Sequence, residues 1–125
     1  MNMKRTLALI ALLAAMACAV NASAAMICTG NLCAEKVSAT ATNSVVTFPG
    51  NPAGGGSVDQ DAVVIYNAGA NEIFVAANAV ATTSSVEIPS GTTLALTGKA
   101  GRLATLGIIC STDETATVHV WATYP

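Results

Sequence analysis

The segment Thr-Ala-Thr-Val-His-Val-Trp-Ala-Thr-Tyr, residues 115–124, sets the fold class of this 125-residue chain. Its even positions from 116 to 122 carry small or β-branched apolar residues, and Thr117, His119 and Trp121 stand between them. Successive side chains of a β-strand point to opposite sides, so this alternation predicts a strand with one side in a core. The pattern leaves open whether the core side carries the small residues or Trp121.

Further strand signals recur at short spacing before this segment. An apolar run at 62–66, turn chemistry at 67–71 and a second apolar run at 72–77 together predict a β-hairpin. The other predicted strands lie at 35–48 (one or two strands, broken near 42–44), 85–88, 92–97 and 103–110. No window beyond the leader has helical periodicity. The sequence therefore predicts an all-β domain of seven or eight short strands, a small β-sandwich or jelly-roll-like domain.

The first 24 residues have the composition of a helical signal peptide. Lys4 and Arg5 precede an uncharged apolar run, residues 7–19, and Ala22-Ser23-Ala24 supplies the small-x-small site that signal peptidases cleave. The apolar run is shorter than the roughly 20 residues that a spanning helix needs. We therefore expect cleavage after Ala24, export of the chain, and no stable membrane span.

Cys18 provides an alternative end to the leader. Lipoprotein signals also end in small residues before a cysteine, and Ala15-Met16-Ala17 precedes this one. Ala15 stands where such sites usually carry a larger aliphatic residue. The sequence favours the cleaved form and leaves acylation of Cys18 as the alternative.

Residues 25–125 are predicted to form a single domain. Within them, residues 49–57 read Pro-Gly-Asn-Pro-Ala-Gly-Gly-Gly-Ser, a concentration of Gly and Pro that no regular element tolerates. This stretch is too short to separate two globular domains. It is predicted to be a flexible loop.

Cleavage would leave an acidic chain. The processed part keeps all seven acidic residues but only Lys36, Lys99 and Arg102 as bases, a formal net charge of −4. Binding of nucleic acids requires clustered cations that displace phosphate counterions, so the composition predicts no nucleic-acid partner. A surface of small, uncharged residues suits packing against further copies or other structural proteins, and it equally suits an ordinary exported domain.

The cysteines predict one disulfide. Cys28 and Cys33 flank a turn with Gly and Asn, and export permits a bond between them. Cys110 lies in an apolar strand and is expected to behave as a small buried hydrophobe. Together with His119 the three cysteines are of the right type for zinc, but their spacing matches no common zinc signature. We predict the disulfide and no metal site.

Residues for catalysis or cofactor binding are few. His119 is the only histidine, so a Ser/His/Asp or Cys/His nucleophile system would depend on it, and no Gly-x-Ser-x-Gly motif accompanies it. Acidic pairs at Asp59/Asp61 and Asp113/Glu114 could bind calcium if their loops met at one end of a sandwich. Such pairs are more typical of solvated turns. The sequence predicts no catalytic residues and no cofactor.

His119, Trp121 and Tyr124 are the candidate interface residues. All three lie on or next to the odd-numbered side of the last predicted strand. If the small residues on the other side fill the core, these three side chains make an adhesive strip that suits contact with another subunit.

Three stretches of the chain look familiar in combination. Residues 63–76 hold a valine-rich strand, a turn with Asn and Gly, and an aromatic strand; residues 88–94 hold a Pro-x-Gly turn; residues 103–120 end in Thr-Ala-Thr-Val. Over residues 60–124, this order resembles small β-sandwich structural proteins of tailed-phage particles. The resemblance implies a virion or surface-assembly component with no catalytic residues to carry over. The signal peptide and the cysteine loop depart from that pattern, because virion proteins are normally built in the cytoplasm.

The sequence as a whole predicts a non-catalytic structural or interaction protein of an exported, surface or virion assembly. A pilin-like or adhesive surface subunit is the first alternative. This alternative is weakened because the chain lacks two cysteines spaced to link the two sheets by a disulfide. A secreted metal-binding module or enzyme that uses Cys110 and His119 is the second.

Overall fold

The computed structural model describes residues 22–50, 60–97 and 103–125. The predicted signal peptide up to residue 21, and the predicted loop from residue 51 onward, lie outside the described residues. Within the described ranges the chain forms ten β-strands and no helix. In chain order the strands are β1 (Ala22–Ala25), β2 (Ile27–Thr29), β3 (Leu32–Ala39), β4 (Ser44–Thr47), β5 (Ala62–Asn67), β6 (Ile73–Ala77), β7 (Val86–Ile88), β8 (Thr93–Thr97), β9 (Thr105–Cys110) and β10 (Ala116–Thr123).

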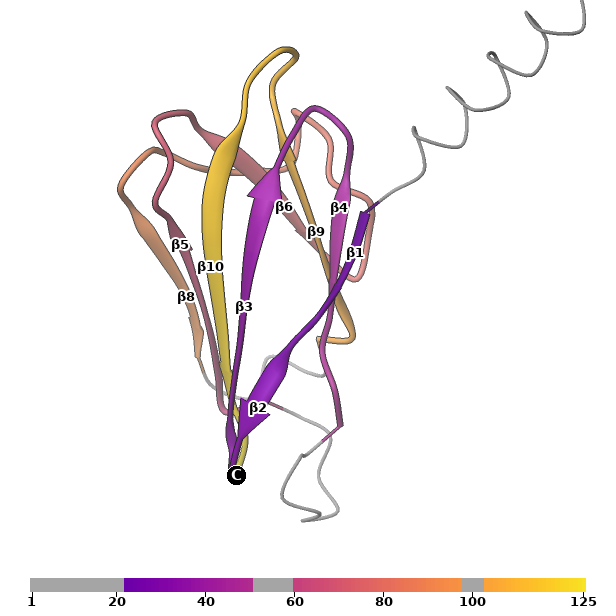
Figure 1. Cartoon of the computed structure of the whole chain (residues 1–125), viewed down its shortest axis with the longest axis vertical. Helices are drawn as coiled ribbons and strands as arrows, with labels where there is room; N and C mark the ends of the chain where they lie inside the picture. The colour runs from indigo at the N-terminus through magenta and orange to yellow at the C-terminus, as the bar shows by residue number, and fades with distance from the viewer. Residues whose placement is uncertain (1–21, 51–59, 98–102) are drawn as a thin grey trace, which may run out of the picture.

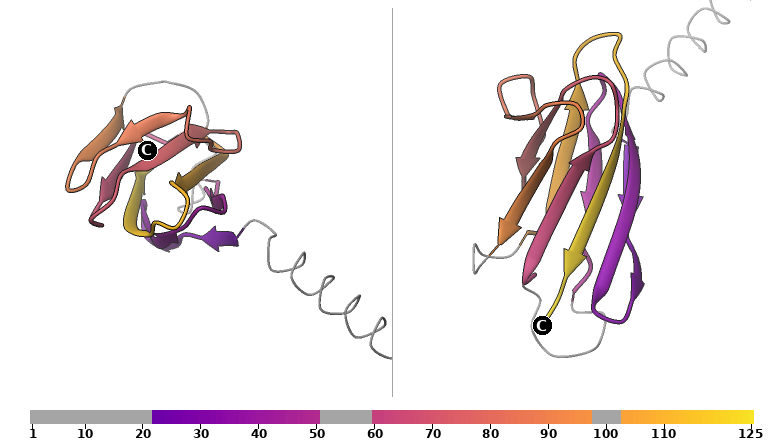
Figure 2. Two further views of the ribbon diagram at one scale, coloured as in Figure 1. Left: turned by 90° about the horizontal axis from the view of Figure 1, so that it is seen from above. Right: turned by 90° about the vertical axis from the view of Figure 1, so that its left-hand side faces the viewer.

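The strands form two five-stranded sheets that pack face to face as a sandwich (Figure 1, Figure 2). The first sheet has the order β1-β4-β9-β6-β7, and the second has the order β2-β3-β10-β5-β8. The pairs are antiparallel except for β1 and β4, which run parallel. The predicted all-β fold is confirmed.

The alternation of β10 determines which side of the second sheet faces the core. Val118, Val120 and Ala122 are fully buried, whereas His119 and Trp121 are half-buried on the outer side. The small residues therefore fill the core, which answers the question that the pattern left open. A fully buried Val or Ile side chain stabilises a fold by about 1.5–3 kcal/mol relative to its exposed state. The core comprises Val46, Phe48, Ile73, Val75, Ile88, Leu103, Leu106, Ile108 and Cys110 on one side, and Cys33, Val37, Ala39, Val63, Ile65, Ala116, Val118, Val120, Ala122 and Tyr124 on the other.

The hairpin predicted from residues 62–66 and 72–77 is wrong. Both strands exist, but β5 lies between β10 and β8 in the second sheet, and β6 lies between β9 and β7 in the first. The turn between them carries the chain from one sheet to the other, so Ile65 and Ile73 contribute to the core from opposite layers. Turn chemistry marks where a chain reverses, but it does not decide whether the next strand pairs or crosses the core.

The predicted number of strands is also too low. The structure adds β1, which lies at the end of the predicted leader, and β2, which forms the first arm of the cysteine loop. Both strands are short, and neither has the alternation of apolar and polar residues by which strands are identified in a sequence.

Asn67 holds together the end of the sandwich where the chain crosses between sheets. This fully buried side chain donates hydrogen bonds from Nδ2 to the carbonyl oxygens of Asn71 (2.8 Å) and Ile88 (3.0 Å). Its Oδ1 accepts a bond from the backbone N–H of Gly69 (3.0 Å). One amide thus joins the β5–β6 crossing to the end of β7, because it offers both donors and an acceptor.

We predict that Asn67→Asp lowers the free energy of unfolding by about 2–3 kcal/mol, because a carboxylate offers no donor to two buried carbonyls. Urea denaturation followed by tryptophan fluorescence measures the loss. Asn71→Asp is the matched control, since the Asn71 side chain donates one exposed bond, to the Thr115 carbonyl (2.9 Å). Equal losses for the two variants would contradict the role given to Asn67.

Candidate interaction surface

The outer side of the second sheet carries two of the three predicted interface residues. His119 and Trp121 project from β10, the central strand of this sheet. The register places Lys36 of β3 and Tyr66 of β5 on either side of His119. This part of the face is therefore built from three neighbouring strands, β3, β10 and β5, and not from the last strand alone.

Three rings form a stack across this face. The centroids of Tyr66 and His119 lie 6.2 Å apart with an interplanar angle of 27°, and those of His119 and Trp121 lie 5.6 Å apart at 11°. Stacked rings gain dispersion energy beyond their buried area and restrict one another's rotation. The imidazole is thus held between two aromatic neighbours, as part of a rigid surface.

A groove runs along this face between β10 and the N-terminal hairpin. It has a volume of about 420 Å³. The side chains that line it and matter most here are Ile27, Leu32, Ala34, Lys36, His119 and Trp121. Ile27 is 77% exposed and Leu32 is 49% exposed, so apolar area faces solvent beside Trp121. Large side chains exposed together in this way are typical of surfaces that bind another macromolecule.

The predicted disulfide fixes the hairpin that forms one wall of this groove. Cys28 and Cys33 are bonded to each other, directly across the β2–β3 pair. A disulfide at this position is typical of proteins that fold in an oxidising, exported environment. By holding β2 against β3, it keeps Ile27 in place on the outer side of the sheet.

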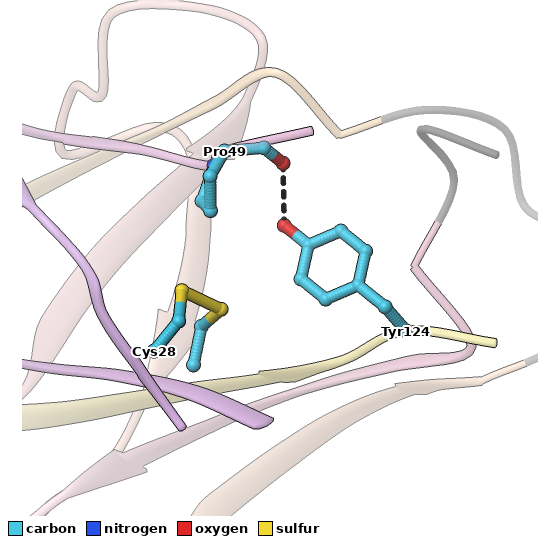
Figure 3. Close-up of a disulfide and its surroundings, with 4 residues drawn as sticks. Cys28, Pro49 and Tyr124 are labelled. Carbon is cyan, nitrogen blue, oxygen red and sulfur yellow. Dashed lines mark hydrogen bonds between the residues drawn. A yellow bond between two sulfur atoms is a disulfide. The ribbon is translucent and has the colours of Figure 1, made fainter. Parts of the chain in front are cut away.

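Tyr124 does not belong to the outer face, which corrects the predicted group of three. Its side chain is buried, and its hydroxyl donates a hydrogen bond to the Pro49 carbonyl at 2.7 Å. Figure 3 shows this bond and the disulfide at the same end of the sandwich. The Tyr124 N–H also donates to the Asn31 carbonyl (2.9 Å), so this residue joins the last strand to the cysteine loop.

Ile27, Leu32 and Tyr66 are surface residues that sequence reasoning missed. Ile27 and Leu32 stand beside the cysteines in a segment interpreted as a loop, and Tyr66 ends an apolar run that indicated core. Only the pairing of β2 with β3, and of β5 with β10, brings them together with Trp121. A simple alternation over residues 27–34 would place Ile27 and Leu32 on opposite sides, and only the turn between β2 and β3 brings them to the same face.

Cys110 and His119 lie in different parts of the molecule. Cys110 is buried between the sheets, with its Sγ 3.7 Å from the Ala39 carbonyl oxygen. His119 is on the outer side of the second sheet. This arrangement does not form the Cys/His pair considered from the sequence, and the prediction of Cys110 as a buried hydrophobe is confirmed.

The zinc and calcium sites considered from the sequence do not form from the described residues. Cys28 and Cys33 are bonded to each other and so offer no thiolates. Asp61 donates its backbone N–H to the Thr123 carbonyl at one end of β10, whereas Asp113 lies in the turn that leads into the other end. Asp59 lies outside the described residues. No group of three or more His, Cys, Asp and Glu side chains in the described ranges is placed to hold a metal ion.

Comparisons with protein-family models and with curated proteins found no match to this chain. In the parts that the structure describes, no helix combines the length and the apolar character needed to cross a membrane.

We predict that Cys110 makes folding stability sensitive to alkaline pH. Burial raises the pKa of its thiol above the ordinary value of 9.0, and the charges of Glu114 and Glu72 raise it further. The unfolded chain ionises this thiol first, so its contribution to stability is complete below pH 9 and is lost as the pH rises toward the folded-state pKa. Urea denaturation between pH 8 and pH 10.5 should therefore show a steeper loss for the wild type than for Cys110→Ala.

The difference between the two proteins cancels the titration of lysines and tyrosines, which both of them share. Parallel pH profiles would contradict this prediction. As an independent check, iodoacetamide at pH 8 should leave Cys110 unmodified in the folded protein and alkylate it in urea, as read by mass spectrometry.

Proposed function

We propose that this chain is a non-catalytic structural subunit of an exported, surface or virion assembly, and that it contacts its neighbours through the outer face of the second sheet. Its partners are further copies of the chain or other structural proteins of the same assembly. The resemblance of residues 60–124 to small β-sandwich proteins of tailed-phage particles favours a virion or surface particle.

The observation that carries this proposal is the exposed apolar area beside a rigid aromatic stack. Ile27 and Leu32 line the same groove as Trp121, and the charged residues that line it are Glu35 and Lys36. Burial of apolar area is the main favourable term in protein association. Large aromatic side chains near the centre of an interface commonly supply much of the binding free energy.

Rigidity of the face supports the same proposal. The disulfide holds the β2–β3 wall, and the ring stack holds Trp121 against its neighbours. A surface that is already ordered loses little conformational entropy when it binds. An assembly subunit that must fit repeatedly against the same neighbour benefits from such a surface.

We expect the purified, exported protein to self-associate as its concentration rises, and Trp121→Ser and Ile27→Ser each to weaken this association at least about tenfold. Sedimentation velocity from low to high micromolar concentration measures the effect. Val86→Ser is the matched control, because Val86 is 58% exposed but lies on β7 of the first sheet.

Two outcomes would count against the proposal. A wild-type protein that stays monomeric at every concentration would refute contact between copies, and an equal effect of Val86→Ser would refute the role of the outer face. Near-ultraviolet circular dichroism of each variant verifies that the sandwich is still folded.

A further inference from the structure

The outer edge of β4 depends on a strand that export is expected to remove. In the first sheet, β4 pairs with β9 on one side and with β1 on the other. The β1 pairing is parallel and runs from Ala22 beside Ser44 to Ala25 beside Thr47. Cleavage after Ala24, the site that the sequence predicts, would remove all of β1 except Ala25.

The backbone geometry shows which groups would lose their partners. The Phe48 N–H donates to the Ala104 carbonyl at 2.9 Å, in register with the β4–β9 pairing. The two backbone groups of one residue in an antiparallel pair point to the same side, and consecutive residues point to opposite sides. Ser44 and Val46 therefore face β9, and Val45 and Thr47 turn their N–H and C=O groups toward β1.

The edge of β4 carries no feature that would prevent another strand from pairing with it. Natural edge strands are usually protected by charged side chains, proline or bulges. Residues 44–47 read Ser-Val-Val-Thr, without charge or proline. By contrast, β7 at the other edge of this sheet contains Glu87. A proline follows each of the two strands, Pro89 directly after β7 and Pro49 two residues after β4, so an added strand can pair with β4 only over residues 44–47.

We propose that removal of the leader uncovers the edge of β4 and that two processed copies pair through it, β4 against β4, antiparallel across a twofold axis. This inference rests on the proposed function, since it presupposes an exported subunit that assembles. An uncharged strand is self-complementary, and an isologous contact of this kind closes at two copies. It joins the two first sheets into one continuous sheet and satisfies the backbone groups of Val45 and Thr47.

In the precursor, the chain's own β1 occupies the same edge. Pairing between copies is therefore prevented until the leader is cut, which couples assembly to export. Acylation at Cys18 would retain β1 and keep the edge closed, so the processing route decides whether this contact forms.

The experiment uses the full precursor, expressed with its leader, and the processed protein recovered after export. Mass spectrometry should give Ala25 as the first residue. Sedimentation of processed Trp121→Ser, in which the outer-face contact is weakened, should show a dimer. Hydrogen exchange of the processed wild type should show protected amides at Val45 and Thr47 in the concentrated sample that exchange at least about tenfold faster on dilution.

Val45→Pro removes an N–H directed to the edge and none directed to β9, so it should abolish the dimer. Val45→Thr, the matched control, keeps the N–H and should leave the dimer intact. In case the proline variant does not fold, a synthetic peptide of residues 20–26 provides a second test on the wild type. As a soluble copy of β1, it should dissociate the dimer and protect both amides.

Three results would overturn the inference: a mature N-terminus that retains Ala22–Ala25, rapid exchange at Val45 and Thr47 at every concentration, or a dimer that the peptide leaves intact. Loss of association in Trp121→Ser with no effect of the peptide would refute edge pairing and leave the proposed function standing. The reverse pattern would refute the role of the outer face and retain edge pairing.

Discussion

Burial of one side of β10 is the constraint on which the rest of the structure depends. This strand pairs over its whole length with β3 and from Val118 onward with β5, and its even-numbered side chains are the centre of the core layer of the second sheet. Since a strand alternates strictly, burying Val118 and Val120 forces His119 and Trp121 to the outside. A one-residue shift of register would exchange the core for the interaction surface.

The two sheets stay in place because their crossings are hydrogen-bonded at both ends. At one end the Asn67 amide joins the β5–β6 crossing to β7. At the other, the Gln60 side chain exchanges two bonds with the backbone of Leu103 (2.7 and 3.1 Å), and Tyr124 binds Pro49. These polar groups are buried, so each bond also avoids the cost of an unsatisfied donor or acceptor. At the described crossings, these side chains supply hydrogen-bond partners for backbone groups of Gly69, Asn71, Ile88 and Leu103.

The proposed contacts follow from what this architecture leaves uncovered. The outer face of the second sheet presents apolar area in the groove beside the ring stack, and the first sheet would end in β4 if cleavage after Ala24 removed β1. The two surfaces belong to different sheets, so one does not block the other. A subunit with one face contact and one edge contact can extend an assembly beyond a dimer, because each contact adds a further copy or partner.

The alternating pattern of residues 115–124, the turn residues and the spacing of the cysteines were enough to determine an all-β chain, most of its strands and the Cys28–Cys33 bond, since these depend on local periodicity and chain reversal. Which strands pair was decided only by the tertiary structure. The predicted hairpin of β5 and β6 does not form, Tyr124 is buried, and Ile27 and Tyr66 lie on the same face as Trp121. Sequence pattern could not show this, because sheet membership depends on contacts between distant segments. The alternation within a strand indicates that one of its sides is buried, but the packing of the whole core decides which other strands cover that side.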